Sequence, residues 1–111
     1  MTASEFARVC DEDELWDGEM AAFRIAGGDV LVVRIDGCYR AYQDSCPHQH
    51  MPLTDGTLTG TTLTCRHHMW QFDVRTGRGI NPAAARLARH PVAVEAGGVW
   101  VQTTPSRDEA P

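Results

Sequence analysis

Lysine is absent from this chain of 111 residues, and all ten of its basic residues are arginine. Long apolar runs are absent too: none extends beyond the length of residues 30–33, whereas a membrane-spanning helix needs roughly 20 residues. The first residues show neither a basic start nor an apolar stretch of signal-peptide length. We therefore expect a protein without a membrane span that works in the cytoplasm, where disulfides are rare and clustered cysteine indicates a metal.

Positive charge is scarce as well. Fifteen acidic residues against ten basic ones give a formal net charge of −5, and ten of the acids lie in the first 45 residues. A nucleic-acid binder needs clustered cations that release counterions from phosphate, so we exclude that function. The acidic run at residues 11–14 is interpreted as a solvated loop or a helical turn.

The length and the composition, 42% hydrophobic and 23% charged, are those of one soluble globular domain, which we assign to residues 1–111. Apolar and polar residues alternate with a period of two between closely spaced turn signals, which predicts short antiparallel strands. Tight hairpin turns require positive φ, which Gly and Asp-Gly tolerate, so we expect such turns at Gly27-Gly28, Asp36-Gly37 and Gly97-Gly98. The strands that they join are expected at residues 20–26, 29–35, 38–43, 91–96 and 99–103.

The middle of the chain departs from this pattern. Shorter strands are expected at residues 61–65 and 70–74, the second ending in a Thr76-Gly77 turn. Helical turns are expected only at residues 12–16 and 82–87, and the tail 104–111 is expected to fray. The predicted fold is an all-β antiparallel sandwich or small barrel with one long excursion, residues 44–82.

The excursion holds four of the five histidines and two of the four cysteines. They form two clusters, Cys-Pro-His-Gln-His at residues 46–50 and Cys-Arg-His-His at residues 65–68. If each cluster occupies the tip of a loop, two thiolates and two imidazoles can meet at one point. The candidate ligands are Cys46, His48, Cys65, and either His67 or His68.

Two kinds of metal site fit this donor set. A structural zinc ion would take all four ligands in a tetrahedron. A Rieske [2Fe–2S] centre would place the cysteines on one iron and the histidines on the other. Structural zinc more often draws two cysteines from one tight turn and two histidines from a helix, whereas here each loop supplies one of each. The pattern favours the Rieske centre and leaves zinc as the alternative.

The two clusters and the segments after them resemble the ligand boxes and the third loop of Rieske ferredoxins. The resemblance rests on Cys46-Pro47-His48-Gln49, Cys65-Arg66-His67-His68-Met69-Trp70, Phe72-Asp73, Thr76-Gly77 and Gly79-Ile80-Asn81-Pro82. It extends from Phe6 to Val101 and is closest to the ferredoxin components of bacterial toluene- and alkene-type diiron monooxygenases. It implies a Rieske-type antiparallel β-sandwich or small barrel with a cluster-binding loop subdomain.

The resemblance also implies a ligand set for one [2Fe–2S] cluster. Cys46 and Cys65 would bind the buried iron, and His48 and His68 the outer, reducible iron. Cys65-x-His67 repeats the spacing of the first box, so spacing alone does not choose between the neighbouring histidines. The second box of the family, Cys-x-x-His, favours His68.

Departures from the respiratory Rieske pattern bear on the reduction potential. In those proteins an extra cysteine in each box forms a disulfide that braces the loops, and the corresponding residues here are Met51 and His67. Those proteins also place Ser and Tyr hydroxyls near the cluster sulfurs, where this chain has Trp70 and Phe72. Such donors stabilise the reduced cluster, so we expect no disulfide and a potential of about −150 mV, near the low end of the Rieske range.

The function that the resemblance implies is electron transfer rather than catalysis. The chain would accept single electrons from an NADH-dependent flavin and iron–sulfur reductase and pass them to the diiron hydroxylase of a monooxygenase in hydrocarbon catabolism. No nucleotide loop, nucleophile–base arrangement or open metal site indicates catalysis. A mobile carrier is expected to be a monomer, and its docking tip is expected to comprise Gln49, His50, Arg66, His67 and Trp70, although Trp70 can equally pack beneath the loop.

Two other functions stay open on the sequence. One is the ferredoxin component of a ring-hydroxylating dioxygenase, which would share the cluster and the fold. The other, of a different class, is a zinc-stabilised binding module without a redox role.

The remaining notable residues are interpreted as structural. Packing roles are expected for Cys10, Cys38, Trp16 and Trp100, a solvent-facing position for His50, and ordinary surface for His90. The fixed φ of proline and the freedom of glycine are expected to shape the cluster loops at Pro47, Pro82, Gly56, Gly60, Gly77 and Gly79.

Overall fold

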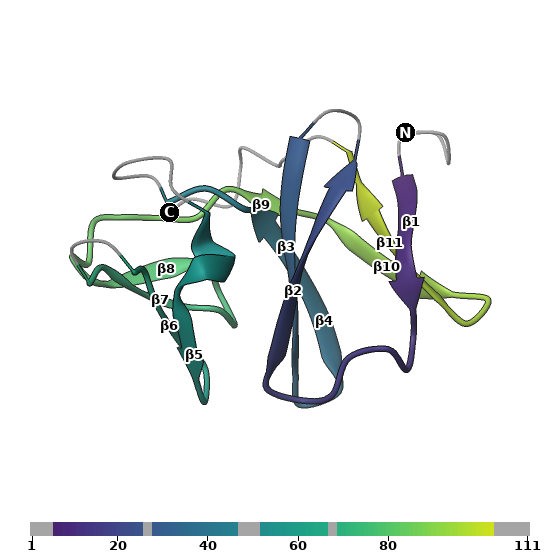
Figure 1. Cartoon of the computed structure of the whole chain (residues 1–111), viewed down its shortest axis with the longest axis horizontal. Helices are drawn as coiled ribbons and strands as arrows, with labels where there is room; N and C mark the ends of the chain where they lie inside the picture. Colours follow the sequence, from purple (N-terminus) through teal and green to yellow (C-terminus); the bar gives the residue numbers. More distant parts are fainter. Residues whose placement is uncertain (1–5, 26–27, 47–51, 67–68, 104–111) are drawn as a thin grey trace.

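The computed structural model describes residues 6–25, 28–46, 52–66 and 69–103. In that part of the chain, eleven strands form three antiparallel sheets that follow one another along the longest axis (Figure 1). The first sheet has the order β1 (Phe6–Asp11), β11 (Gly98–Gln102), β10 (Val92–Glu95). The second has the order β2 (Glu19–Ile25), β3 (Gly28–Ile35), β4 (Cys38–Gln43), β9 (Arg89–His90).

The predicted excursion forms the third sheet. Its order is β5 (Thr57–Thr59), β6 (Thr62–Thr64), β7 (Gln71–Asp73), β8 (Arg78–Asn81). A short 3-10 turn, η2 (Leu53–Asp55), precedes it. The all-β antiparallel fold with a separate loop-bearing subdomain is thus confirmed.

Only one of the predicted hairpin turns lies where its signal places it; at the predicted Gly27-Gly28 turn, Gly28 already belongs to β3 and pairs with Ile25, and Gly27 lies outside the described residues. Asp36 and Gly37 connect β3 to β4 with φ values of 53° and 79°, as the Asp-Gly signal predicts. The last hairpin turns at Ala96 and Gly97, with φ values of 55° and 75°, one residue earlier than predicted. Gly98 instead opens β11, where a Cβ would lie 2.5 Å from Nε of Arg8. The side chain of Arg8 therefore lies over Gly98, and a Cβ there would displace it.

The central strand β3 is buried on both faces. Leu31, Val33 and Ile35 belong to a core cluster shared with the third sheet, whereas Val30 and Val32 belong to a second cluster shared with the first sheet. Side chains alternate between the faces of a strand, so one strand contributes to both cores. The apolar run at residues 30–33 is explained by this double burial.

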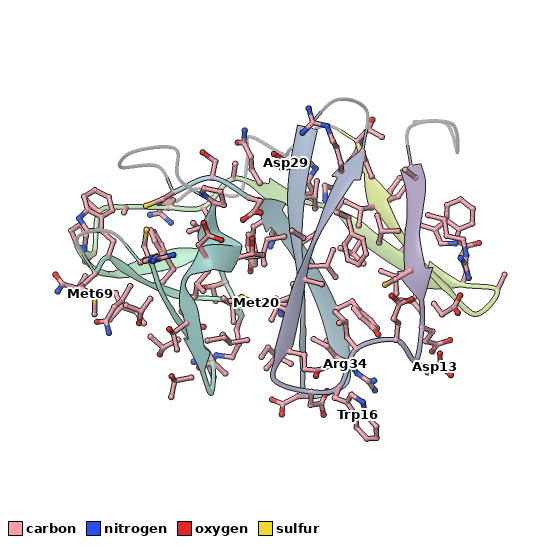
Figure 2. The ribbon with its side chains drawn as sticks, in the orientation of Figure 1. Asp13, Trp16, Met20, Asp29, Arg34 and Met69 are labelled. Atoms are coloured by element: carbon pink, nitrogen blue, oxygen red, sulfur yellow. The ribbon has the colours of Figure 1, made fainter. Side chains whose placement is uncertain are left out.

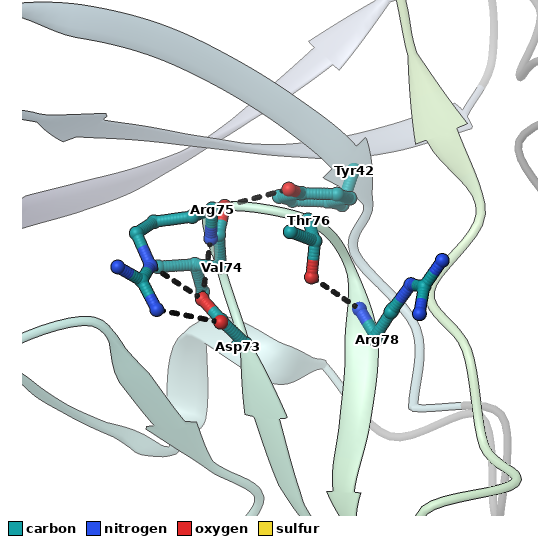
Figure 3. Close-up of polar contacts among 6 residues, drawn as sticks. All are labelled: Tyr42, Asp73, Val74, Arg75, Thr76 and Arg78. Carbon is teal, nitrogen blue, oxygen red and sulfur yellow. Dashed lines mark hydrogen bonds and ion pairs between the residues drawn. The ribbon is translucent and has the colours of Figure 1, made fainter.

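Tyr42 joins the second sheet to the third (Figure 3). Its side chain is fully buried, and its hydroxyl donates a 2.6 Å hydrogen bond to the carbonyl oxygen of Val74. Burial raises the pKa of Tyr42 to about 12, so the hydroxyl keeps its proton. Gly77, at φ 81°, lies so close to the ring that a Cβ would be 2.9 Å from its Cε1 atom. The predicted turn at Gly77 is confirmed, and the ring of Tyr42 packs against it.

The two predicted helical turns are wrong. Residues 12–16 form turns and bends, and residues 82–87 form a turn followed by an isolated bridge between Arg86 and Arg78. Segments of five or six residues gain too few hydrogen bonds to offset helix nucleation. The N–H of Gly79 donates to the carbonyl oxygen of Ala85 at 2.7 Å, which holds the second segment as a loop. No helix in the described residues is long and apolar enough to cross a membrane.

Three predicted exposures are also wrong. Trp16 is 75% exposed, in the connection between β1 and β2, and Cys38 is exposed beside the hairpin turn. His90 was expected at the surface but is buried, and its Nδ1–H donates to the backbone carbonyl of Gln102 at 2.7 Å. Cys10 is buried as predicted, and Trp100 is half-buried in β11.

Candidate metal centre

The two predicted cysteine ligands are buried in the same core. Cys46 follows β4 and Cys65 follows β6, and each is 1% exposed. Both belong to the core cluster that contains Leu53, Leu63 and Phe72. The fold therefore places both thiols in the one core that the subdomain with the loops shares with the central sheet.

The first loop is anchored on both sides of the segment after Cys46. Before it, Asp44 is buried and its N–H donates to the carbonyl oxygen of Asp29 at 3.0 Å. After it, η2 buries Leu53 completely in the core. The carboxylate of Asp44 accepts hydrogen bonds from the backbone N–H and the hydroxyl of Thr54, at 3.0 and 2.9 Å. The loop thus has fixed ends.

The end of this loop also lies against the strand that leads to the second cysteine. A Cβ on Gly56 would lie 3.1 Å from both the carbonyl oxygen of Leu53 and the carbonyl carbon of Thr64, and closer still to the carbonyl oxygen of Thr64. Thr64 is the residue before Cys65. The glycine therefore permits a close backbone approach between the two cysteine-bearing segments, which is a different role from the bend that the sequence predicts.

The second loop is closed by its own backbone. The N–H of Cys65 donates to the carbonyl oxygen of Trp70 at 2.7 Å, which joins the two ends of this loop. Within it Arg66 is exposed, and Met69 is 64% exposed with a φ of 57°. Trp70 is partly buried against the core, which supports the packing role that the sequence left open. Figure 2 shows Met69 at one end of the molecule, away from Trp16.

The third loop is tightly folded at its predicted glycine and proline. A Cβ on Gly79 would fall 2.6 Å from the carbonyl oxygen of Ala85, and the bond between Asn81 and Pro82 is cis. Gly60 adopts a φ of 60° in the turn between β5 and β6. Gly60 and Gly77 thus serve as the predicted bends, whereas Gly56 and Gly79 serve close approach.

The remaining predicted site residues lie outside the described residues: Pro47, His48, Gln49, His50, Met51, His67 and His68. Their assignments stay predictions. Within the described part of the chain, no three His, Cys, Asp or Glu residues gather as a metal site. The four cysteines form no disulfide, as predicted.

The two cysteines that the structure does place fit an iron–sulfur cluster. A thiolate is the form that binds iron, and burying an unpaired anion is costly. Cys46 and Cys65 are buried among apolar side chains, where a bound iron would balance their charge. Asp73, at the end of β7, pairs instead with the exposed Arg75 (Figure 3). The hydrogen bonds from Arg75 lower the pKa of the Asp73 carboxyl.

Sequence reasoning missed two features of the site. Met69 is the most exposed large apolar residue in the described part of the subdomain, and nothing in the sequence distinguishes it from Trp70, which is partly buried. The bond between Asp44 and Thr54 was missed because its partners are ten residues apart. An acid two residues before a ligand cysteine was the one available signal.

Comparisons with known proteins identify the family of the chain. The family model described as Rieske [2Fe-2S] domain matches residues 5–94. The ferredoxin component of the alkene monooxygenase system of Xanthobacter autotrophicus is 45% identical over 102 residues, which cover 91% of this chain and 84% of that protein.

Two dioxygenase proteins are also similar. The biphenyl dioxygenase ferredoxin subunit of a Pseudomonas species is 33% identical, over 86% of this chain and 90% of that protein. A chain in the solved complex of reduced oxygenase and oxidized ferredoxin of carbazole 1,9a-dioxygenase superposes with a TM-score of 0.84. That chain is 26% identical, and the match covers 94% of this chain and 98% of that one.

Proposed function

The chain belongs to the Rieske [2Fe-2S] domain family, and we propose that it carries single electrons from an NADH-dependent flavin reductase to the diiron hydroxylase of a hydrocarbon monooxygenase. Its cofactor is a Rieske-type [2Fe–2S] cluster, which when bound accepts and releases one electron at a time. The protein is thus proposed as a carrier between two enzymes.

In this proposal the ligands are those predicted from the sequence. Cys46 and Cys65 bind the inner iron from buried positions, and His48 and His68 bind the outer iron. The buried cysteines exclude water from the thiolate side of the site. The histidine side, at the loop ends, provides the route for the electron to the surface.

The single observation that carries the proposal is the pairing of two buried cysteines with exposed residues, Arg66 and Met69, in the second ligand loop. Each cysteine is 1% exposed, and four residues beyond Cys65 in sequence Met69 is 64% exposed. An apolar side chain held outward beside a redox centre suits brief docking of a partner, because apolar contact buries area without a fixed charge pattern. We therefore add Met69 to the expected docking tip of Arg66, Trp70 and the neighbouring loop residues.

Similarity favours a monooxygenase as the partner. The relative that serves an alkene monooxygenase is 45% identical, against 33% for the biphenyl dioxygenase ferredoxin. The dioxygenase alternative is favoured by a different observation, the TM-score of 0.84 to a chain of the carbazole dioxygenase complex. The fold and the cluster suit both classes of oxygenase. We therefore expect exposed loop residues such as Met69 to determine which oxygenase the protein binds.

Reconstituted turnover tests this proposal. The holoprotein is combined with a flavin reductase, NADH, and in parallel a diiron alkene monooxygenase hydroxylase or a ring-hydroxylating dioxygenase. We expect product with the first oxygenase and at least about tenfold less with the second. Faster turnover with the dioxygenase would overturn the choice of partner, and zinc in place of iron would overturn electron transfer itself.

Two variants locate the docking surface in the same assay. Met69→Glu is expected to lower turnover at limiting carrier concentration, because it places a charge in the apolar contact. Trp16→Glu is the matched control, since Trp16 is also an exposed apolar residue, at 75% against 64%, but lies away from Met69 (Figure 2). Equal effects of both changes would contradict docking at the tips.

We also propose that the protein is a cytoplasmic monomer. Size-exclusion chromatography of the holoprotein tests its oligomeric state.

A further inference from the structure

Asp44 is a buried acid whose two carboxylate oxygens both have partners. Its Oδ1 accepts the backbone N–H of Thr54 at 3.0 Å, and its Oδ2 accepts the Thr54 hydroxyl at 2.9 Å. The residue is only 8% exposed, and its own N–H is bound to the carbonyl of Asp29 in β3. Hydrogen bonds therefore fix the backbone of Asp44 to the central sheet and its carboxylate to the η2 turn.

These two hydrogen bonds close the first loop of the metal centre. Residues 44 and 54 stand on either side of Cys46 and of the predicted ligand His48. Pro52, at the start of η2, has no side-chain acceptor for the free N–H groups of that turn. Asp44 supplies the acceptor from across the loop, as an N-cap residue does from within a helix. The hydrogen bond from the N–H of Thr54 to Asp44 therefore caps the η2 turn and joins the two ends of the first loop.

The chain has no covalent alternative to this closure. The positions at which respiratory Rieske proteins carry the bracing disulfide are Met51 and His67, and all four cysteines are free thiols. Leu53 adds an apolar anchor beside the hydrogen bonds, since it is completely buried next to the core that holds both cysteines. A carboxylate that accepts two hydrogen bonds at a buried site gives a directional contact as well as an energetic one.

We propose that Asp44 and Thr54 are a positioning pair, which sets the geometry of the first ligand loop by a non-covalent brace in place of a disulfide. The inference rests on the cluster assignment in the proposed function and not on the choice of oxygenase. Neither residue binds iron. They act through the backbone on both sides of the loop, and so control the orientation of Cys46 and His48 and the retention of the cluster.

The test compares four variants of the holoprotein. Asp44→Ala removes both hydrogen bonds, and Thr54→Val removes the hydroxyl bond with little change of shape. Thr54→Ser keeps both bonds. Asp17→Ala is the matched control: Asp17 also accepts a backbone N–H, from Gly37 at 2.9 Å, but in the hairpin end of the second sheet.

Two quantities are measured: the electron paramagnetic resonance line shape of the reduced protein, and the rate at which a chelator bleaches the visible absorbance. One lost hydrogen bond changes an equilibrium by about fivefold. We therefore expect bleaching about fivefold faster in Thr54→Val and about 20-fold faster in Asp44→Ala, with a broadened signal in both. Thr54→Ser and Asp17→Ala are expected to match the wild type.

Each outcome decides between the alternatives. A wild-type line shape in Thr54→Val and Asp44→Ala, or the same broadening in Asp17→Ala, would overturn the positioning role and leave only a general contribution to stability. If Asp44→Ala does not fold, Thr54→Val against Thr54→Ser still decides. Failure of the proposed function is seen separately, as the absence of a Rieske signal in the wild type.

Discussion

Gly56→Ala is expected to damage the site without touching any ligand. The new Cβ would lie 3.1 Å from two backbone atoms, of Leu53 and Thr64, and closer still to the carbonyl oxygen of Thr64. Real Cβ atoms essentially never come closer than 3.0 Å to such neighbours, so backbone must move. Both neighbours are fixed, Leu53 by burial in the core and Thr64 by its pairing with Thr57.

The size of the effect follows from this rigidity. Overpacking costs 1–3 kcal/mol, and a clash with backbone on both sides belongs at about 3 kcal/mol. For a domain of this size each kcal/mol lowers the midpoint of thermal unfolding by about 4 °C or more, so we expect a fall of at least about 12 °C. Separation of the first loop from the strand before Cys65 is also expected to lower the iron content.

Thermal unfolding of the holoprotein, followed by circular dichroism with iron analysis, measures both effects. Gly28→Ala is the control, because its Cβ would lie 3.8 Å from its nearest neighbour, the carbonyl oxygen of Ile25. That change is expected to be neutral or slightly stabilising. A Gly56→Ala protein with full iron content and an unfolding midpoint within about 3 °C of the wild type would refute the reasoning.

Three further predictions concern the ligands, the potential and the buried histidine. His68→Ala is expected to abolish the Rieske spectrum and His67→Ala to keep it, and the reverse result would move the ligand to His67. Redox titration is expected to give about −150 mV, since Trp70 and the buried Phe72 carry no hydroxyl, and a value above roughly +100 mV would contradict this. Burial lowers the pKa of His90. Below the unfolded pKa of about 6.5, the unfolded chain therefore binds a proton at His90 more readily than the folded protein does, and the folded protein loses stability as the pH falls. Between pH 7.5 and 5.5 the midpoint of thermal unfolding should therefore fall further in the wild type than in His90→Gln. Equal falls would show that His90 does not contribute to the pH dependence.

Local turn chemistry is what made the fold predictable. Asp36-Gly37 can adopt the two positive φ values of a tight hairpin, and once that turn is placed, the alternation of β3 and β4 fixes their register. The Gly97-Gly98 signal is one residue out, because Ala96 adopts the first positive φ of the turn and Gly98 already belongs to β11, where it pairs with Glu95.

Burial was less predictable because it depends on which sheet covers which residue. Trp16 and its neighbour Leu15 lie in the same connection between β1 and β2, yet Trp16 is 75% exposed whereas Leu15 packs into the core. His90 precedes a proline and is expected at the surface, but it lies in β9, pairs with Ala41 of β4 and has its ring against the carbonyl of Gln102. Neither outcome can be derived from the segment itself.

The candidate site divides in the same way. Cys46 and Cys65 could be identified from their spacing relative to histidine, because metal ligation imposes that local pattern. The brace between Asp44 and Thr54 could not, since a hydrogen bond across a loop leaves no periodic signal. Met69 was missed because outward projection depends on a positive φ that methionine rarely adopts.

The most direct test of the central claim is the electron paramagnetic resonance spectrum of the dithionite-reduced protein, with iron and acid-labile sulfide measured on the same sample. We predict the rhombic signal of a histidine-ligated [2Fe–2S] cluster and about two irons and two sulfides per chain. Absence of the signal and of sulfide, with one zinc per chain in anaerobically purified protein, would contradict it and identify a structural zinc domain.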